Sequence, residues 1–199
     1  MRGVTLVELL VTMAVLAILM FAVAPDVISI MSNSRVRSSA EAMSAGLQRA
    51  RVEAMRRNEP VSFWIMTGNA SNVLDNSCAP AANGSSWVVS ADDPSGGCSA
   101  DPSDTAAPRI KAKHDGGAPS STIAIAATQA DRATTATNVV FDGYGRIAGA
   151  GMRFVDIASA STGSDSRALR IELTTSGVVR MCEPLIAAGG TDPRRCLFS

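Results

Sequence analysis

Aromatic side chains and histidine are scarce in this sequence, and the chain carries no net charge. Aromatic residues make up 4% of the 199 residues, and His114 is the single histidine. Lys and Arg number 18, as do Asp and Glu, so no overall field attracts the chain to nucleic acid or to an acidic membrane surface. His114 lies in the segment 111–117, KAKHDGG, which is typical of a solvated turn. The sequence therefore offers no nucleophile and base pair, and we do not expect an enzyme.

Signatures of metal ions and cofactors are also missing. No cluster of Asp, Glu, His or Cys has metal-ligand spacing, although Asp92 and Asp93 leave a loop calcium site as the open alternative. The stretch 143–146, GYGR, has the wrong spacing for a dinucleotide-binding loop, and strand residues follow it instead of a helix. We interpret it as a turn and expect no cofactor.

The four cysteines lie in the polar part of the chain, without a Cys-x-x-Cys pair that would indicate zinc or redox chemistry. They are Cys78, Cys98, Cys182 and Cys196. Two disulfides in an oxidising compartment fit this arrangement, and free buried thiols are the alternative. Of the three possible pairings, the sequence-local ones, Cys78 with Cys98 and Cys182 with Cys196, are favoured.

A long apolar run near the N-terminus predicts a membrane span. Residues 4–24 contain one charge, Glu8, and are long enough to cross a hydrocarbon core of about 30 Å as a helix. Helical patterning resumes after Pro25, unlike the sequence after a secretory signal peptide. A carboxylate in such a span costs roughly 2.5 kcal/mol or more unless it lies near the interface or has a partner. Glu8 therefore predicts a partner, and an interfacial carboxylate at the helix start is the alternative.

Beyond Pro25 the pattern predicts a second, amphipathic half of the same helix. Apolar residues recur at spacings of three and four, and the other faces are charged. The stripe consists of Val36, Ala40, Met43, Leu47, Ala50 and Ala54. Arg37 with Glu41, and Arg49 with Glu53, have the spacing of surface ion pairs. The Asn58-Glu59-Pro60 segment predicts the helix end, with Pro25 as a kink.

The remaining chain predicts a β-rich domain, which makes the fold class α+β. Alternation at Val61, Phe63 and Ile65 marks the first strand. Further strands are predicted at 86–90, 109–113, 122–127, 139–141, 152–157, 168–174 and 178–182, with a hairpin through residues 175–177. The tracts 67–107 and 158–166 resemble exposed loops that cannot form a core. We expect the helix stripe to pack on one sheet face.

The residues around the apolar run resemble a known family. The segment GVTLVELL, residues 3–10, resembles the processing site of type IV pilins and type II secretion pseudopilins. The resemblance implies that a prepilin peptidase cuts after Gly3 and that Val4 becomes an N-methylated terminus. Glu8 would then meet the terminal amine of a neighbouring subunit during assembly. Two departures are a Val in place of the usual Phe at the first mature position and a three-residue leader.

Three further segments are similar to the GspH/FimT branch of minor pilins: GLQRARVEAMRRN at 46–58, FDGYGRI at 141–147 and RIELTTSGVVRMC at 170–182. The resemblance implies a non-enzymatic minor pilin at the tip of a type IV pilus that helps to prime assembly. Its partners would be other minor and major pilins, prepilin peptidase and the inner membrane. The implied parts are a leader (1–3), a transmembrane and fibre-core helix (4–25), an amphipathic helix (26–58) and a periplasmic domain (59–199). The minor pseudopilin of a type II secretion system is the alternative.

Some members of this family bind double-stranded DNA during uptake, through C-terminal arginines that contact phosphates. Arg180, Arg194 and Arg195 are the candidates in this chain. The match is imperfect, because Gly177-Val178-Val179-Arg180 lacks the first arginine of the family element and no glycine precedes Arg194. A hydrated rim closed by Cys182 and Cys196 is the favoured interpretation.

Overall fold

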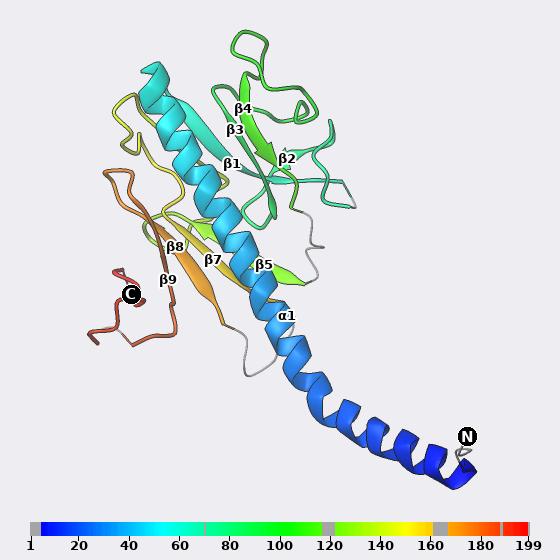
Figure 1. Ribbon diagram of the computed structural model, residues 1–199. Coiled ribbons are helices and arrows are strands. Elements are labelled where there is room, and N and C mark those ends of the chain that lie inside the picture. Colours follow the sequence, from blue (N-terminus) through cyan, green and yellow to red (C-terminus); the bar gives the residue numbers. More distant parts are fainter. Residues whose placement is uncertain (1–4, 70, 117–121, 161–166, 188, 199) are drawn as a thin grey trace.

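A long helix leads into two antiparallel sheets (Figure 1). The computed structural model describes residues 5–69, 71–116, 122–160, 167–187 and 189–198, without the side chains of residues 21–28. Its elements are α1 (Leu6–Arg57), β1 (Val61–Thr67), β2 (Ala79–Pro80), β3 (Ser86–Ser90), β4 (Ile110–His114), β5 (Ile123–Thr128), β6 (Asn138–Phe141), β7 (Phe154–Ser159), β8 (Leu169–Leu173) and β9 (Val179–Cys182). The predicted α+β class is confirmed, and every predicted strand has a counterpart.

The first sheet is organised around β1. Strand β3 pairs with one edge of β1, and β4 pairs with the other edge of β3. Strands β6 and the short β2 both pair with the second edge of β1. The second sheet has the order β5-β7-β8-β9. Residues 175–177 connect β8 to β9 as the predicted hairpin. The two-residue strand β2 was not predicted, because its sequence, Ala79-Pro80, has no alternating pattern.

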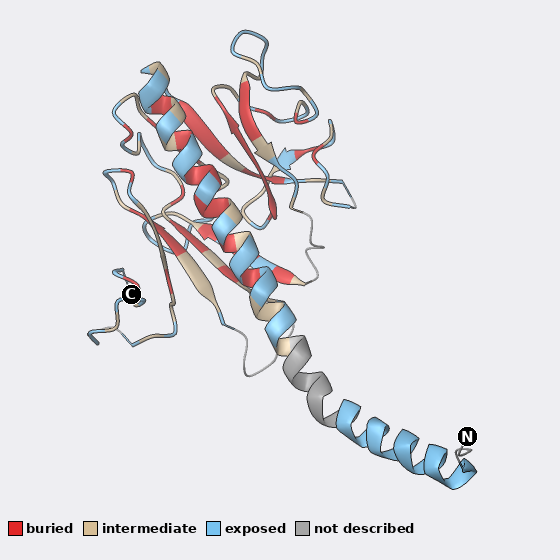
Figure 2. Cartoon of the chain, viewed as in Figure 1, coloured by how far each residue is buried: buried red, intermediate tan, exposed pale blue. Residues whose placement is uncertain are grey.

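The predicted apolar stripe of α1 forms the centre of the main core. All six of its residues are buried, and they pack with Phe63 and Ile65 of β1 and with Val155, Ile157 and Ile171 of the second sheet. The helix contacts both sheets, so the expectation of one sheet face was wrong (Figure 2). Strand periodicity marks which residues are buried but not which sheet they belong to.

A glycine lets the helix approach the first sheet closely. A Cβ atom at Gly46 would lie 2.7 Å from the Phe63 ring and 2.8 Å from the Trp87 ring. The helix ends as predicted, with Asn58 in a left-handed conformation (φ 52°) whose N–H bonds the Ala54 carbonyl. The predicted kink at Pro25 falls within residues 21–28 and stays a prediction.

Of the two predicted surface ion pairs on the helix, one is present. Arg37 Nε lies 2.8 Å from Glu41 Oε1. The prediction for Arg49 was wrong, because Glu53 pairs instead with two arginines of the last turn, Arg56 and Arg57. Arg49 donates a hydrogen bond to the backbone carbonyl of Lys111 in β4. Helical spacing predicts neighbours along the helix but not competition from a sheet.

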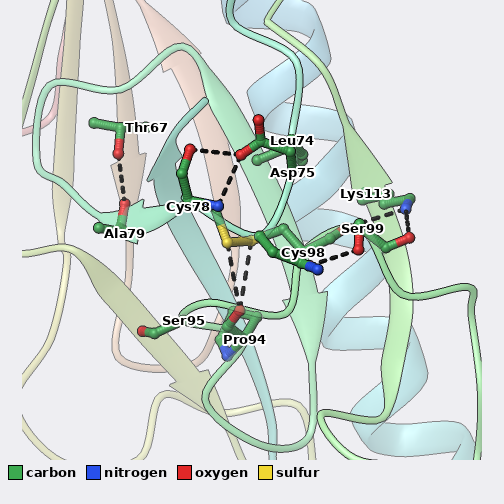
Figure 3. The surroundings of a disulfide bond; sticks show 12 residues. Thr67, Leu74, Asp75, Cys78, Ala79, Pro94, Ser95, Cys98, Ser99 and Lys113 are labelled. Carbon is green, nitrogen blue, oxygen red and sulfur yellow. Dashed lines mark hydrogen bonds between the residues drawn. A yellow bond between two sulfur atoms is a disulfide. The ribbon is translucent and has the colours of Figure 1, made fainter. Parts of the chain in front are cut away.

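The long segment 67–107 contains a second small core, so the prediction that it cannot form one was wrong. The Cys78–Cys98 disulfide, at the favoured pairing, is buried with Leu74 against Met66 and Val88 on the far face of the first sheet. Lys113 of β4 donates hydrogen bonds to the carbonyls of residues 98, 99 and 100, as Figure 3 shows in part. The disulfide supplies the apolar contacts that the residues of this segment otherwise lack.

A charge network joins the end of the helix to β4 and to the loop before it. Asp104 accepts hydrogen bonds from Arg57 at 2.6 Å and from the buried Lys111 at 3.0 Å. These two bonds lower the pKa of the Asp104 carboxyl from 3.8 to about 2. Arg109 is held between Asp92 and Glu59 nearby. The network fixes the distal end of the domain.

We expect acid to weaken the fold through Asp104. Its folded-state pKa is lowered, so its contribution to stability is present above about pH 4 and is lost as the pH falls toward about 2. Asp104→Asn removes this dependence. Thermal unfolding of residues 29–199 should show a lower Tm than wild type at pH 7 and a smaller difference at pH 2. A constant difference across this range would contradict the prediction, and Asp101→Asn, at an exposed position, is the control.

Candidate functional site

Residues 6–20 of α1 present apolar side chains on all sides, and none of them is buried. Residues 5–20 are all exposed, in contrast to the buried stripe further along the helix (Figure 2). Leu6 is 78% exposed and Ile18 is 69% exposed. The other large apolar side chains on this half are Val7, Leu9, Leu10, Val11, Met13, Val15, Leu16, Leu19 and Met20. Such a surface requires an apolar environment, either lipid or another protein.

Glu8 is the only charged residue within residues 5–20. Thr5 caps the helix, because its Oγ1 accepts the N–H of Glu8 at 3.3 Å. Glu8 thus occupies the third helical position, where the helix dipole favours a carboxylate. Within the described residues its side chain forms no hydrogen bond or ion pair. The carboxylate is therefore available to a partner.

The predicted processing residues, Gly3 and Val4, lie outside the described residues. Within the described residues, no helix is long and apolar enough to cross a membrane.

The segments 141–147 and 170–182, which resemble the GspH/FimT branch, both contact Arg51 of the helix. The sequence analysis did not predict this role of Arg51. Arg51 donates through Nε to the Gly145 carbonyl at 3.0 Å and through a terminal nitrogen to the Ser176 carbonyl at 3.5 Å. The predicted turn at 143–146 is confirmed, with the Asp142 side chain accepting two backbone N–H groups. Arg51 therefore joins this turn to the β8–β9 hairpin. The two segments thus bind the same helix residue, and the position of Arg51 in the helix sequence does not indicate which distant carbonyls it will bind.

Glycines at this junction permit backbone contact. Gly177 has a φ of +77°, and a Cβ there would lie 1.9 Å from the Gly145 carbonyl oxygen. Gly149 has a similar φ of +73°, but a Cβ there would meet no atom within 4 Å. The two positions share a backbone conformation that favours glycine and differ in the space around it.

A buried carboxylate fixes the C-terminal segment against the second sheet. Glu172 of β8 is 1% exposed and accepts the backbone N–H groups of Leu197 and Phe198 at 2.9 and 3.1 Å. The Cys182–Cys196 disulfide, also at the favoured pairing, closes the segment beside it. Glu172 was not predicted, because a glutamate in a strand gives no sign of which distant backbone it will bind.

The candidate DNA-binding arginines lie near one another, but two of them have intramolecular partners. Arg180 donates to the carbonyls of Pro193 and Arg195, at 2.8 and 3.1 Å. Arg194 pairs with Asp192 and Glu183, and its guanidinium lowers the pKa of the Asp192 carboxyl. The backbones of Arg195 and Glu183 form an isolated parallel β-bridge. These contacts hold the C-terminal segment, and the two carboxylates offset the charge that Arg194 could offer to a phosphate.

Other candidates have structural roles. His114 does not lie in a turn: it ends β4, and its ring stacks on Trp87 with 5.5 Å between centroids. Asp92 pairs with Arg109, and Asp93 accepts hydrogen bonds from Ser95. Among the described residues, one group has metal-ligand geometry, Glu172 with Cys182 and Cys196, and its two sulfurs form a disulfide.

Comparison with known families agrees with this geometry. The family described as type II transport protein GspH matches residues 39–177, which include most of the core and both turns that Arg51 joins. The chain belongs to the GspH family. A second family, the prokaryotic N-terminal methylation motif, matches residues 1–24. The GspH match thus covers the packed half of α1 and most of the sheets, while the methylation motif covers the exposed apolar half.

Two crystal structures of the type IV minor pilin FimU from Pseudomonas aeruginosa are similar to this GspH-family chain. Their sequence identities are 17% and 18%, and their TM-scores are 0.43 and 0.41. The alignments cover 76% and 74% of this chain and 90% and 92% of the FimU chains. Among curated proteins, no sequence matches the chain.

The junction at Arg51 predicts unequal effects of two glycine substitutions. Gly149→Ala should cost about 1 kcal/mol, from backbone strain alone. Gly177→Ala adds an overlap with the Gly145 carbonyl, so we expect it to cost roughly 2 kcal/mol more than Gly149→Ala. Urea unfolding of residues 29–199 measures both. Equal losses would show that the backbone contact does not constrain this GspH-family domain.

Proposed function

We propose that this chain is a minor pilin of a type IV pilus, held in the inner membrane before it joins the tip of the fibre and helps to prime assembly. The observation that carries the proposal is the exposed apolar half of α1, which has one carboxylate and follows an N-terminal methylation motif. Membership of the GspH family supports a structural subunit rather than an enzyme.

The exposed apolar side chains near the start of α1 could contact lipid before assembly and the helices of other subunits after it. Its 52 residues correspond to a length of about 78 Å, and the packed stripe begins at Val36. The preceding half therefore extends beyond the globular domain (Figure 1). Lipid chains and the helices of neighbouring subunits would each cover its side chains. The globular domain would lie in the periplasm, where its disulfides are stable.

Processing gives Glu8 its role. Cleavage after Gly3 creates an amine at Val4, and this positive charge adds to the positive end of the helix dipole. The carboxylate of Glu8 from a neighbouring subunit would neutralise that amine in an apolar fibre core, where an unpaired charge is costly. Since the Glu8 side chain has no partner within the described residues, it is free to do so.

A second candidate is the minor pseudopilin of a type II secretion system, which the family description favours. Deleting the gene separates the two. A minor pilin predicts loss of piliation and twitching with normal exoprotein release, and a pseudopilin predicts the reverse. We do not extend the proposal to DNA uptake, because Arg180 and Arg194 are engaged within the chain.

We expect Glu8→Ala to leave cleavage intact and to abolish incorporation into fibres. Removal of the carboxylate leaves the Val4 amine of the neighbouring subunit unpaired. Cleavage should be unaffected, because the cleaved bond follows Gly3 and does not involve Glu8. Immunoblots of membrane and sheared-pilus fractions measure both steps, with Asp101→Ala, at an exposed position in the globular domain, as the control. Normal amounts of Glu8→Ala protein in the fibre fraction would overturn the proposed docking role.

A further inference from the structure

A polar pocket lies where α1 meets the ends of strands from both sheets. Arg35, Ser38 and Ser39 form its helix wall, at spacings that place them on one face of the helix. Residues 114–116, at the end of β4, form a second wall, and Thr122, beside the start of β5, forms a third. The volume is about 520 Å³, within the range of small-molecule sites. Most of the side chains that line it are polar, so the pocket suits a polar ligand.

The wall at the end of β4 is held in place by hydrogen bonds to neighbouring residues of the first sheet. Ser86 Oγ accepts the backbone N–H of Gly116 at 2.9 Å. One carboxylate oxygen of Asp115 accepts the backbone N–H of Leu74 at 2.7 Å. Both bonds exist without a ligand, so the wall would need little reorganisation to bind one.

Some polar groups of the pocket have no partner within the part of the chain that the structure describes. The Arg35 guanidinium forms no ion pair or hydrogen bond there, whereas Arg37, two residues further along, pairs with Glu41. Ser85, which also lines the pocket, is 9% exposed, and its Oγ has no hydrogen-bond partner. Buried hydroxyls in proteins are nearly always hydrogen-bonded, so an unpartnered one in a pocket wall points to a ligand.

The two opposite charges of the pocket come from different walls. The Arg35 guanidinium, on the helix, can bind a carboxylate through two parallel N–H groups. The second carboxylate oxygen of Asp115, on the sheet side, can only accept, so it suits a hydroxyl donor. Serine and threonine hydroxyls lie around them and can both donate and accept. The apolar side chains of the lining are Ala42 and Ile123. The matching ligand is small, rich in hydroxyls and acidic at one end.

We propose that this pocket binds an acidic sugar, with the sugar carboxylate on Arg35 and the sugar hydroxyls on Asp115 and the surrounding serines. The inference goes beyond the proposed function, because none of the lining residues belongs to the exposed apolar half of α1. The same sugar acid could arrive as a free monosaccharide or as the end of a polysaccharide. Both sources present the same carboxylate and ring hydroxyls to the pocket.

Ligand-observed NMR titrations of the full chain in detergent micelles test the pocket. The probes are D-glucuronate, D-glucose, which lacks the carboxylate, and alanine, which has a carboxylate but no sugar hydroxyls. We expect saturable binding of glucuronate with a Kd of about 1 mM, and binding of the other two that is about tenfold weaker. A short glucuronate oligomer distinguishes the sources. Binding as tight as that of the monosaccharide identifies a chain end, weaker binding identifies the free sugar, and both support an acidic sugar.

Two arginine variants make the test specific to the pocket. Arg35→Gln should weaken glucuronate binding about tenfold and leave glucose binding unchanged, because it removes only the charged contact. Arg35→Lys keeps the charge and should retain part of the affinity. Arg37→Gln is the matched control, since residue 37 lies about 200° away around the helix axis, and it should bind as wild type does. Circular dichroism checks that each variant is folded.

Three results would overturn the inference. They are no saturable glucuronate binding by the wild-type chain up to about 50 mM, equal binding of glucose or alanine, and equal losses in Arg35→Gln and Arg37→Gln. The titrations do not require fibre assembly. Normal incorporation of Glu8→Ala protein would therefore count against the proposed function alone, and absent sugar binding would count against the pocket alone.

Discussion

The fit of one apolar helix face against two sheets is the constraint on which the fold depends. The stripe from Val36 to Ala54 includes three alanines, and Gly46 lets the aromatic rings of the first sheet approach the helix. The second sheet packs on the same stripe through Ile157 and Ile171. Since α1 contacts both sheets, its position fixes their relation to each other. A change on this face would therefore affect every layer of the domain.

The same helix carries a second apolar surface, which no other part of the described chain covers. The packed half has one buried face and charged outer faces, whereas the half before residue 20 is apolar on every side and has Glu8 as its one charge. The first pattern belongs to a core in water, and the second to a helix surrounded by lipid or by other helices. The two family matches follow the same division, because the GspH match begins at residue 39 in the packed half and the N-terminal methylation motif ends at residue 24.

Local patterns in the sequence were sufficient for the helix stripe, the positions of all strands except the two-residue β2, and both disulfide pairings. Each of these depends on residues that lie close together in the chain. The division into two sheets was not predictable, because Phe63 and Ile171 have the same alternating pattern in different sheets. Contacts between distant side chains and backbone were missed as well: Arg51 binds turns about 94 and 125 residues away, and Glu172 binds the C-terminal segment. The small core of segment 67–107 includes the Cys78–Cys98 disulfide. The low apolar content of the segment gave no sign of this core.

Both disulfides close short stretches, and neither joins the helix to a sheet. Cys78–Cys98 lies within the connection around β2 and β3, and Cys182–Cys196 joins β9 to the C-terminal segment. Apart from the backbone at residues 58–60, no covalent link carries a pulling force from α1 to the sheets. It would be carried by the apolar stripe, by Arg51 and by the ion pairs of Arg57. Under sustained tension the helix would separate from the sheets first, while the two disulfide-closed stretches kept their shape.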